Sequence, residues 1–221
     1  MRFRRKADAG ADVAGEATPD VSANDPASPD ESVASPAQPP SGGPFDIADV
    51  DGDGVERADL GSVLVPAIAG RELRLQVDEA SGAVRAVMLA GSDGACEFQA
   101  FAAPRNGDLW SDVRPQIAAD MARRGGEAVE REGRWGTELV CQMPVKRPDG
   151  TAATQPSRII GINGERWMLR ASFLGRPAVE PDASTEWEDA LAQVVVRRGD
   201  HAMPVGEPLP VQLPDDARRV R

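Results

Sequence analysis

TQPSRIIGINGERWMLR, residues 154–170, is the stretch that indicates the fold class. It joins two strand-like runs, Arg158–Ile162 and Glu165–Phe173, through the dipeptide Asn163-Gly164. Asn-Gly between two such runs is the strongest short-range sign of a β-hairpin. The second run alternates side chains typical of the two faces of a strand, namely Trp167, Leu169, Ala171 and Phe173 against Arg166, Met168, Arg170 and Ser172. The stretch therefore predicts antiparallel β-structure with Asn163-Gly164 as its turn.

Other segments on both sides of this hairpin show strand patterns. Alternation or turn-bounded apolar runs predict further strands at Arg71–Val77, Ala83–Ala90, Ala95–Ala102, Glu127–Glu132 and Trp135–Val145. Cys96 and Cys141 each fall on the apolar face of a predicted strand, where a thiol packs as a small hydrophobe. We therefore expect the two cysteines to be neighbours in one core.

Two segments have helical spacing. Trp110, Val113, Ile117 and Met121 recur every three to four residues and are followed by Gly125, which predicts a helix capped by Ser111. A second helix is predicted from about Glu186 to Arg197, opened by the capping box of Thr185 and Glu188. The sequence thus predicts an α+β fold, with a mainly antiparallel sheet of six to seven strands packed against two helices on one side.

Composition divides the chain into three parts. Residues 1–44 begin with the basic stretch MRFRRK and continue with Ala, Asp, Ser, Pro and Gly, which predicts a disordered leader. Residues 45–213 are predicted to form a single domain, and residues 214–221 a C-terminal tail. Within the domain, residues 202–214 hold four prolines and are expected to be extended.

Charge and cysteine content narrow the compartment and the partners. The chain carries a net charge of −11, of which residues 45–213 hold −9, and such an acidic domain repels phosphate backbones. Nucleic acid is therefore a disfavoured partner. With two cysteines, no signal peptide and no apolar stretch of membrane-spanning length, we expect a cytoplasmic protein. The oligomeric state and any protein partner stay open.

The segment DVDGDGVERADL, residues 49–60, resembles a calcium loop in its first half only. Asp49, Asp51 and Asp53 occupy the first three ligand positions of an EF-hand loop, but Leu60 stands where a bidentate carboxylate is required. We interpret the segment as an acidic turn and predict no metal site.

One group of basic side chains is a candidate binding site. Arg74, Arg158, Arg166 and Arg170 are expected on strand faces opposite the apolar ones, where neighbouring strands would bring them close enough to hold a phosphate or carboxylate. The alternative is that these arginines form ion pairs with glutamates on an exposed sheet face. The sequence favours the ion pairs.

No catalytic set can be assembled from the sequence. His201, the single histidine, stands in a polar loop, and no nucleophile motif, phosphate-binding glycine loop or cofactor motif is present. We therefore predict no catalytic residues and no cofactor.

Several segments in succession resemble a family of uncharacterised actinobacterial proteins grouped as a domain of unknown function. The resemblance rests on ELRLQVDE, FQAFAAPR, GTEL, TQPSRIIGINGERWMLR and VVVRRGD, in this order, after an Ala/Asp/Pro-rich leader. It implies a cytosolic domain and supplies no residue roles. The function expected from the sequence is a non-catalytic cytosolic binding or adaptor module. The alternatives are an enzyme or binder for a phosphorylated small molecule or nucleotide, and a nucleic-acid-associated protein.

Overall fold

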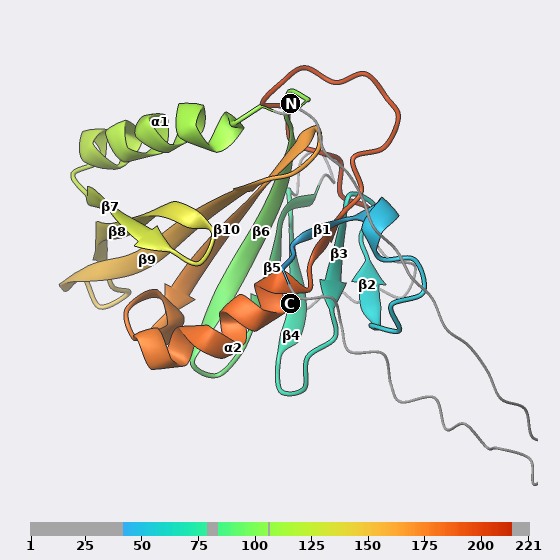
Figure 1. Ribbon diagram of the computed structural model, residues 1–221. Helices are drawn as coiled ribbons and strands as arrows, with labels where there is room; N and C mark the ends of the chain where they lie inside the picture. Colours follow the sequence, from blue (N-terminus) through green and yellow to red (C-terminus); the bar gives the residue numbers. More distant parts are fainter. Residues whose placement is uncertain (1–41, 79–83, 106, 214–221) are drawn as a thin grey trace, which may run out of the picture. The chain divides into compact units, whose positions relative to one another are not determined.

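A computed structural model describes residues 42–78, 84–105 and 107–213 (Figure 1). Residues 1–41 of the expected leader and the expected tail, residues 214–221, lie outside the described residues. Within the described residues, no helix is long and apolar enough to cross a membrane.

A seven-stranded antiparallel sheet forms the centre of the fold. In spatial order its strands are β4 (Glu72–Val77), β5 (Val84–Ala90), β6 (Gly94–Ala102), β10 (Trp167–Gly175), β9 (Ala152–Asn163), β8 (Gly136–Lys146) and β7 (Glu127–Gly133). The predicted α+β class and the predicted antiparallel sheet are confirmed.

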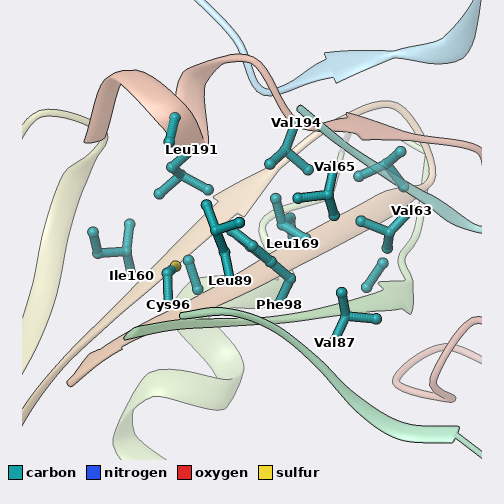
Figure 2. Packing of buried hydrophobic residues seen from close by; sticks show 14 of the residues in the cluster. Val63, Val65, Val87, Leu89, Cys96, Phe98, Ile160, Leu169, Leu191 and Val194 are labelled. Carbon is teal, nitrogen blue, oxygen red and sulfur yellow. The ribbon is translucent and has the colours of Figure 1, made fainter. Parts of the chain in front are cut away.

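A small second sheet packs beside the large one. Its strands, in spatial order, are β1 (Phe45–Asp46), β11 (Val195–Val196), β3 (Val63–Pro66) and β2 (Arg57–Asp59). The described residues also form two short 3-10 turns, η1 (Ile47–Asp49) and η2 (Arg176–Ala178). Val63 and Val65 of β3 enter the same apolar layer as Leu89 and Phe98 of the large sheet (Figure 2).

The two helices cover opposite faces of the large sheet, so the expectation that both lie on one side is wrong. Phe173 packs with Trp187 and Leu191 of α2 (Pro181–Ala192). Met168, five residues earlier on β10, points to the other face and packs with Trp110 of α1 (Leu109–Arg123). Both faces need a cover because apolar side chains project from both, Phe173 on one face and Met168 on the other.

The cysteines are separated by this arrangement. Cys96 lies in the core under α2, whereas Cys141 lies in the core under α1. They are therefore not neighbours, contrary to expectation. Burial raises the pKa of the Cys96 thiol well above its ordinary value and raises that of Cys141 as well.

Both helices begin earlier than predicted. Asp108, not Ser111, caps α1 by accepting a hydrogen bond from the Ser111 backbone N–H at 3.0 Å. Pro115 is consequently inside the helix, where it has no N–H for the carbonyl four residues before it. α2 begins at Pro181, whose fixed φ suits the first helical turn. It ends at Ala192 because the β-branched residues Val195 and Val196 form strand β11 instead.

The hairpin at Asn163-Gly164 is confirmed, but its turn is centred on Glu165 and Arg166, two residues further along. Asn163 pairs with Met168 and the Gly164 N–H donates to the Trp167 carbonyl at 2.8 Å, so Glu165 and Arg166 are the central residues of the turn, and Arg166 adopts a left-handed conformation with φ of 64°. A Cβ on Gly164 would stand 2.1 Å from the Trp167 ring. Glycine is therefore needed for the close approach of this ring, and not for a positive φ at its own position.

Three arginines of the sheet side hold three acidic residues of α2. They donate hydrogen bonds in the pairs Arg71–Glu186 at 3.1 Å, Arg158–Glu188 at 2.5 Å and Arg134–Asp189 at 2.7 Å. Arg158 also donates from Nε to Glu138 at 2.8 Å, and the side chains of this pair are only 4% and 1% exposed. A Cβ on Gly133 would lie 2.4 Å from a Glu138 oxygen, so this glycine leaves room for the buried carboxylate.

We predict that Glu138→Met lowers the free energy of unfolding by about 3–5 kcal/mol, because it leaves the buried Arg158 charge without its main partner. The double variant Glu138→Met/Arg158→Met should recover a large part of the loss, since it removes both charges. Denaturant unfolding of the wild type, of Glu138→Met, of Arg158→Met and of the double variant measures the free energies of unfolding. Removal of the exposed pair between Arg123 and Asp120 is the control and should cost under about 1 kcal/mol. A double variant no more stable than Glu138→Met would contradict this account.

Candidate anion-binding cleft

The structure does not bring the four sequence-predicted arginines together. Arg158 pairs across the strands with Phe173, on the face covered by α2, whereas Arg170 lies three residues from Phe173 on the opposite face. Arg74 shares the face of Arg170, but β5 and β6 lie between their strands. Arg166 stands in the hairpin turn. The arginines therefore occupy separate environments.

Two of the four bind partners on the face of the sheet that carries α1. Arg74 donates two hydrogen bonds to Glu72, the shorter at 2.8 Å. Arg170 donates to the Gln99 side chain at 2.5 Å and lies 5.3 Å from the centre of the Phe101 ring. Burial lowers the pKa of Arg170 from its ordinary value. These contacts match the ion-paired alternative for Arg74 and a mixed polar and aromatic contact for Arg170.

The acidic segment at residues 49–59 engages an arginine. Asp53 accepts two hydrogen bonds from Arg57, at 3.0 Å and 2.7 Å, and these bonds hold the pKa of Asp53 below its usual value. Asp49 and Asp51 are exposed. Among the described residues, no three His, Cys, Asp or Glu side chains gather in a metal-binding arrangement. The carboxylate of Asp53 thus acts as a turn-closing group.

A cleft of about 460 Å³ lies where the turn between β2 and β3 meets the chain that follows β11. Its wall consists of Asp59, Gly61, Ser62, Arg197, Arg198, Gly199, His201, Met203, Pro210, Gln212 and Leu213. Its described charges sum to +1 with a neutral histidine, in a domain that carries −9. An anion is therefore the kind of ligand that this part of the surface attracts.

Arg197 is fixed by a carboxylate and a carbonyl. It donates to both Asp59 oxygens at 2.9 Å and to the Gly61 carbonyl, also at 2.9 Å. Its backbone N–H donates to the Ser62 carbonyl at 2.9 Å, which ties the segment after β11 to the start of β3. This double attachment makes one wall of the cleft rigid.

Arg198 is held by neutral groups. Its Nε donates to the Arg166 carbonyl at 3.2 Å and its Nη1 donates to the His201 carbonyl at 3.1 Å. Within the described residues it forms no hydrogen bond or ion pair with a carboxylate. Backbone carbonyls orient the guanidinium without cancelling its charge, so Arg198 keeps a net positive charge at the cleft.

A buried hydroxyl completes the polar wall. Ser62 is 5% exposed, and its Oγ has no hydrogen-bond partner among the described residues. A buried hydroxyl without a partner is uncommon because desolvation costs free energy that a bond would offset. Arg197 and Arg198 thus offer donors of the kind that bind phosphate or carboxylate oxygens, and the buried Ser62 hydroxyl lies behind them.

Sequence reasoning missed this cleft because its two sides are far apart in the chain. The predicted second helix ends at Arg197, although the run Val194–Val196 before it is a strand signal. The extended Pro-rich segment, predicted from residue 202 onward, forms the far side: Leu209 donates to the Ala100 carbonyl at 2.8 Å. The pairing of β11 with β3 and the bridge between Gly61 and Val211 bring these parts together.

Comparisons with known proteins identify a family whose function is unknown. A family model described as a protein of unknown function (DUF3710) matches residues 43–220. Comparison with curated proteins finds no match. One crystal structure, of a protein from Bacteroides thetaiotaomicron VPI-5482, is similar with a TM-score of 0.39 and 11% sequence identity. The alignment covers 67% of this chain and 50% of that chain, so this chain spans about half of that protein's length.

We predict that the pKa of Asp59 lies below its ordinary value of 3.8, because Arg197 donates two hydrogen bonds to the ionised carboxylate. The Asp59–Arg197 pair should therefore stabilise the fold above that value, and the contribution should be lost as the pH falls through the lowered pKa. Carbon-13 titration of Asp59 measures the shift. Arg197→Met should return the pKa toward 3.8, and its loss of stability relative to wild type should be larger at neutral pH than in acid. An unchanged Asp59 titration in the variant would contradict the assignment.

We predict that Arg166→Gly raises the free energy of unfolding by about 1 kcal/mol, because glycine adopts a φ of 64° without the steric cost that arginine bears there. Glu165→Gly, one residue earlier in the same loop, is the matched control. Glu165 has no positive φ, so its replacement should lower stability by about 0.5–1 kcal/mol. Thermal and denaturant unfolding measure both variants. Equal effects of the two substitutions would show that backbone strain at Arg166 is negligible.

Proposed function

The chain belongs to the DUF3710 family of proteins of unknown function, and from the site described above we propose that it is a non-catalytic binding module for a small anionic molecule. The ligand would carry a phosphate or carboxylate group and would occupy the cleft between the β2–β3 turn and the segment after β11. The single observation that supports this proposal is the guanidinium of Arg198, oriented by two backbone carbonyls and free of carboxylate partners within the described residues.

The surroundings of Arg198 support an anion of limited size. Arg197 lies beside Arg198 in the wall and adds positive charge, and His201 is exposed at the same wall. Met203, Pro210 and Leu213 provide an apolar side against which a ring or chain can rest. A volume of about 460 Å³ is within the range of small-molecule sites.

The state of the reactive groups supports binding without catalysis. Asp59, the carboxylate in the wall with His201, is engaged by Arg197 and is not oriented toward the imidazole by any described hydrogen bond. Cys96 and Cys141 are buried in the two cores, away from the residues of the cleft. Both thiols are free, which suits the cytoplasmic location that forms part of the same proposal.

Isothermal titration calorimetry with inorganic phosphate, pyrophosphate and adenosine monophosphate tests the proposal on the full-length protein. We expect at least one of these probes to bind with one-to-one stoichiometry. Arg198→Gln should weaken the binding by about tenfold to a hundredfold, because it removes charge-assisted hydrogen bonds. His201→Ala is a second variant, at an exposed position that the fold does not need, and should weaken binding more mildly.

Arg123→Ala is the matched control for the loss of one positive charge. Arg123 is exposed at the end of α1 and pairs with Asp120, so its removal should leave the affinity unchanged. If the Arg123 and Arg198 variants lost affinity equally, general charge attraction would explain the binding, and the proposal would be contradicted. The proposal would also be contradicted if Arg198→Gln bound all three probes with the affinity of the wild type. It would be contradicted too if the wild type bound none of them at millimolar concentration.

A further inference from the structure

Strand β7 forms one open edge of the large sheet (Figure 1). It pairs with β8 on one side, and within the described residues no strand pairs with its other side. Glu127 and every residue from Val129 to Glu132 are exposed, and Val129 is 55% exposed. An open edge of this kind can add a strand from another chain through its backbone N–H and C=O groups.

The hairpin of β7 and β8 determines which backbone groups face outward. Its loop is the two residues between the paired Gly133 and Gly136. Such a hairpin closes on a pair that exchanges backbone hydrogen bonds, and bonded and non-bonded pairs then alternate along the strand. Every second residue counted back from Gly133 therefore bonds to β8, and Val129 is one of these. The residues between them, including Glu130, turn their N–H and C=O groups to the open edge.

Opposite charges flank Val129 on one face of β7. Arg131 donates from Nε and Nη2 to the buried Glu138, on the face that carries α2. Val129 and Glu127 share this face because side chains alternate along a strand. Glu127 forms no hydrogen bond or ion pair within the described residues. The open edge thus carries an acidic and a basic side chain at equal distances on either side of an exposed valine.

This charge pattern is complementary to itself. When β7 pairs antiparallel with a second β7 and Val129 lies on the two-fold axis, Glu127 of each copy stands opposite Arg131 of the other. Placing the axis at any charged residue of β7 would instead set two like charges opposite each other, and placing it at Ala128 would form no pair of opposite charges. Edge charges usually prevent strand pairing. On β7 they favour one register with one partner.

We propose that the protein forms a two-fold symmetric dimer through β7, in which the two large sheets join into one. The two Val129 side chains meet at the axis, and an ion pair between Glu127 and Arg131 lies on each side of them. The partner is a second copy of this chain, because a symmetric interface requires both complementary charges on one strand and β7 carries both. The dimer does not depend on the anion-binding function proposed above.

Sedimentation equilibrium of the full-length protein, from micromolar to submillimolar concentration, tests for the dimer. We expect a reversible dimer with a dissociation constant in the micromolar range, because the contact between two edge strands is small. A protein that stays monomeric up to submillimolar concentration would overturn the proposal.

Glu127→Arg tests the charge pairs. It should weaken dimerisation at least about tenfold, because two attractions at the interface become two repulsions. Glu132→Arg is the matched control, since it makes the same change of net charge on the same strand but lies beyond the ion pairs. The control should dimerise at least as strongly as the wild type. Equal weakening in the two variants would overturn the proposed pairing.

Glu130→Pro tests the backbone pairing. The N–H of residue 130 faces the open edge, so proline removes a hydrogen bond between the copies and none to β8. We expect at least about tenfold weaker dimerisation, whereas Glu130→Ala keeps the N–H and should dimerise like the wild type. A folded proline variant that dimerises like the wild type would contradict the proposal, and Glu127→Arg decides it if the proline variant does not fold.

Val129→Cys tests the register directly. In the proposed dimer residue 129 forms a non-hydrogen-bonded pair with its copy, with Cα atoms about 4.5 Å apart, which a disulfide can span. Mild oxidation should therefore cross-link Val129→Cys, and should leave Glu132→Cys as separate chains. Cys96 and Cys141 are buried and should not react. Cross-linking of Glu132→Cys but not of Val129→Cys would show that the register is wrong.

Discussion

The docking of α2 on the large sheet is the contact on which the rest of the structure depends. Trp187 and Leu191 supply its apolar part, and both are fully buried. Around them, arginines from three separate places in the chain bind Glu186, Glu188 and Asp189. Because α2 is fixed in this way, the chain that leaves it is fixed too, and β11 forms between β1 and β3. The position of Arg197 and Arg198 follows from the end of β11.

The buried pair of Arg158 and Glu138 fixes α2 in one position more than it adds stability. Burying two charges costs free energy that their attraction only partly offsets, and apolar pairs are often as stable. A helix held only by Trp187 and Leu191 could turn or slide with little penalty. Glu188 must meet Arg158, however, and Arg158 already donates to Glu138. A shifted α2 would leave a charge buried without a partner, so the network selects a single arrangement.

The sequence predicted elements well where one pattern dominated, and less well where two competed. The hairpin at Asn163 and the seven-stranded antiparallel sheet followed from alternation and turn residues. β9 carries Ile159 and Ile160 in succession, and both are buried, so alternation could not tell which face Arg158 occupies. The same ambiguity placed both helices on one side and both cysteines in one core. The cleft depends on the pairing of β11 with β3, and strands of two to four residues leave little periodicity to detect.

Strand β3 gives a physical reason for the preformed wall of the Arg198 cleft. Ser62, just before β3, lies in the wall of the Arg198 cleft, and the turn after β3 leads to Arg71. Between them, Val63 and Val65 are fully buried in the main core, so the strand cannot shift without breaking close packing (Figure 2). A rigid strand holds the wall of the cleft in place before any ligand arrives, which lowers the ordering cost of binding.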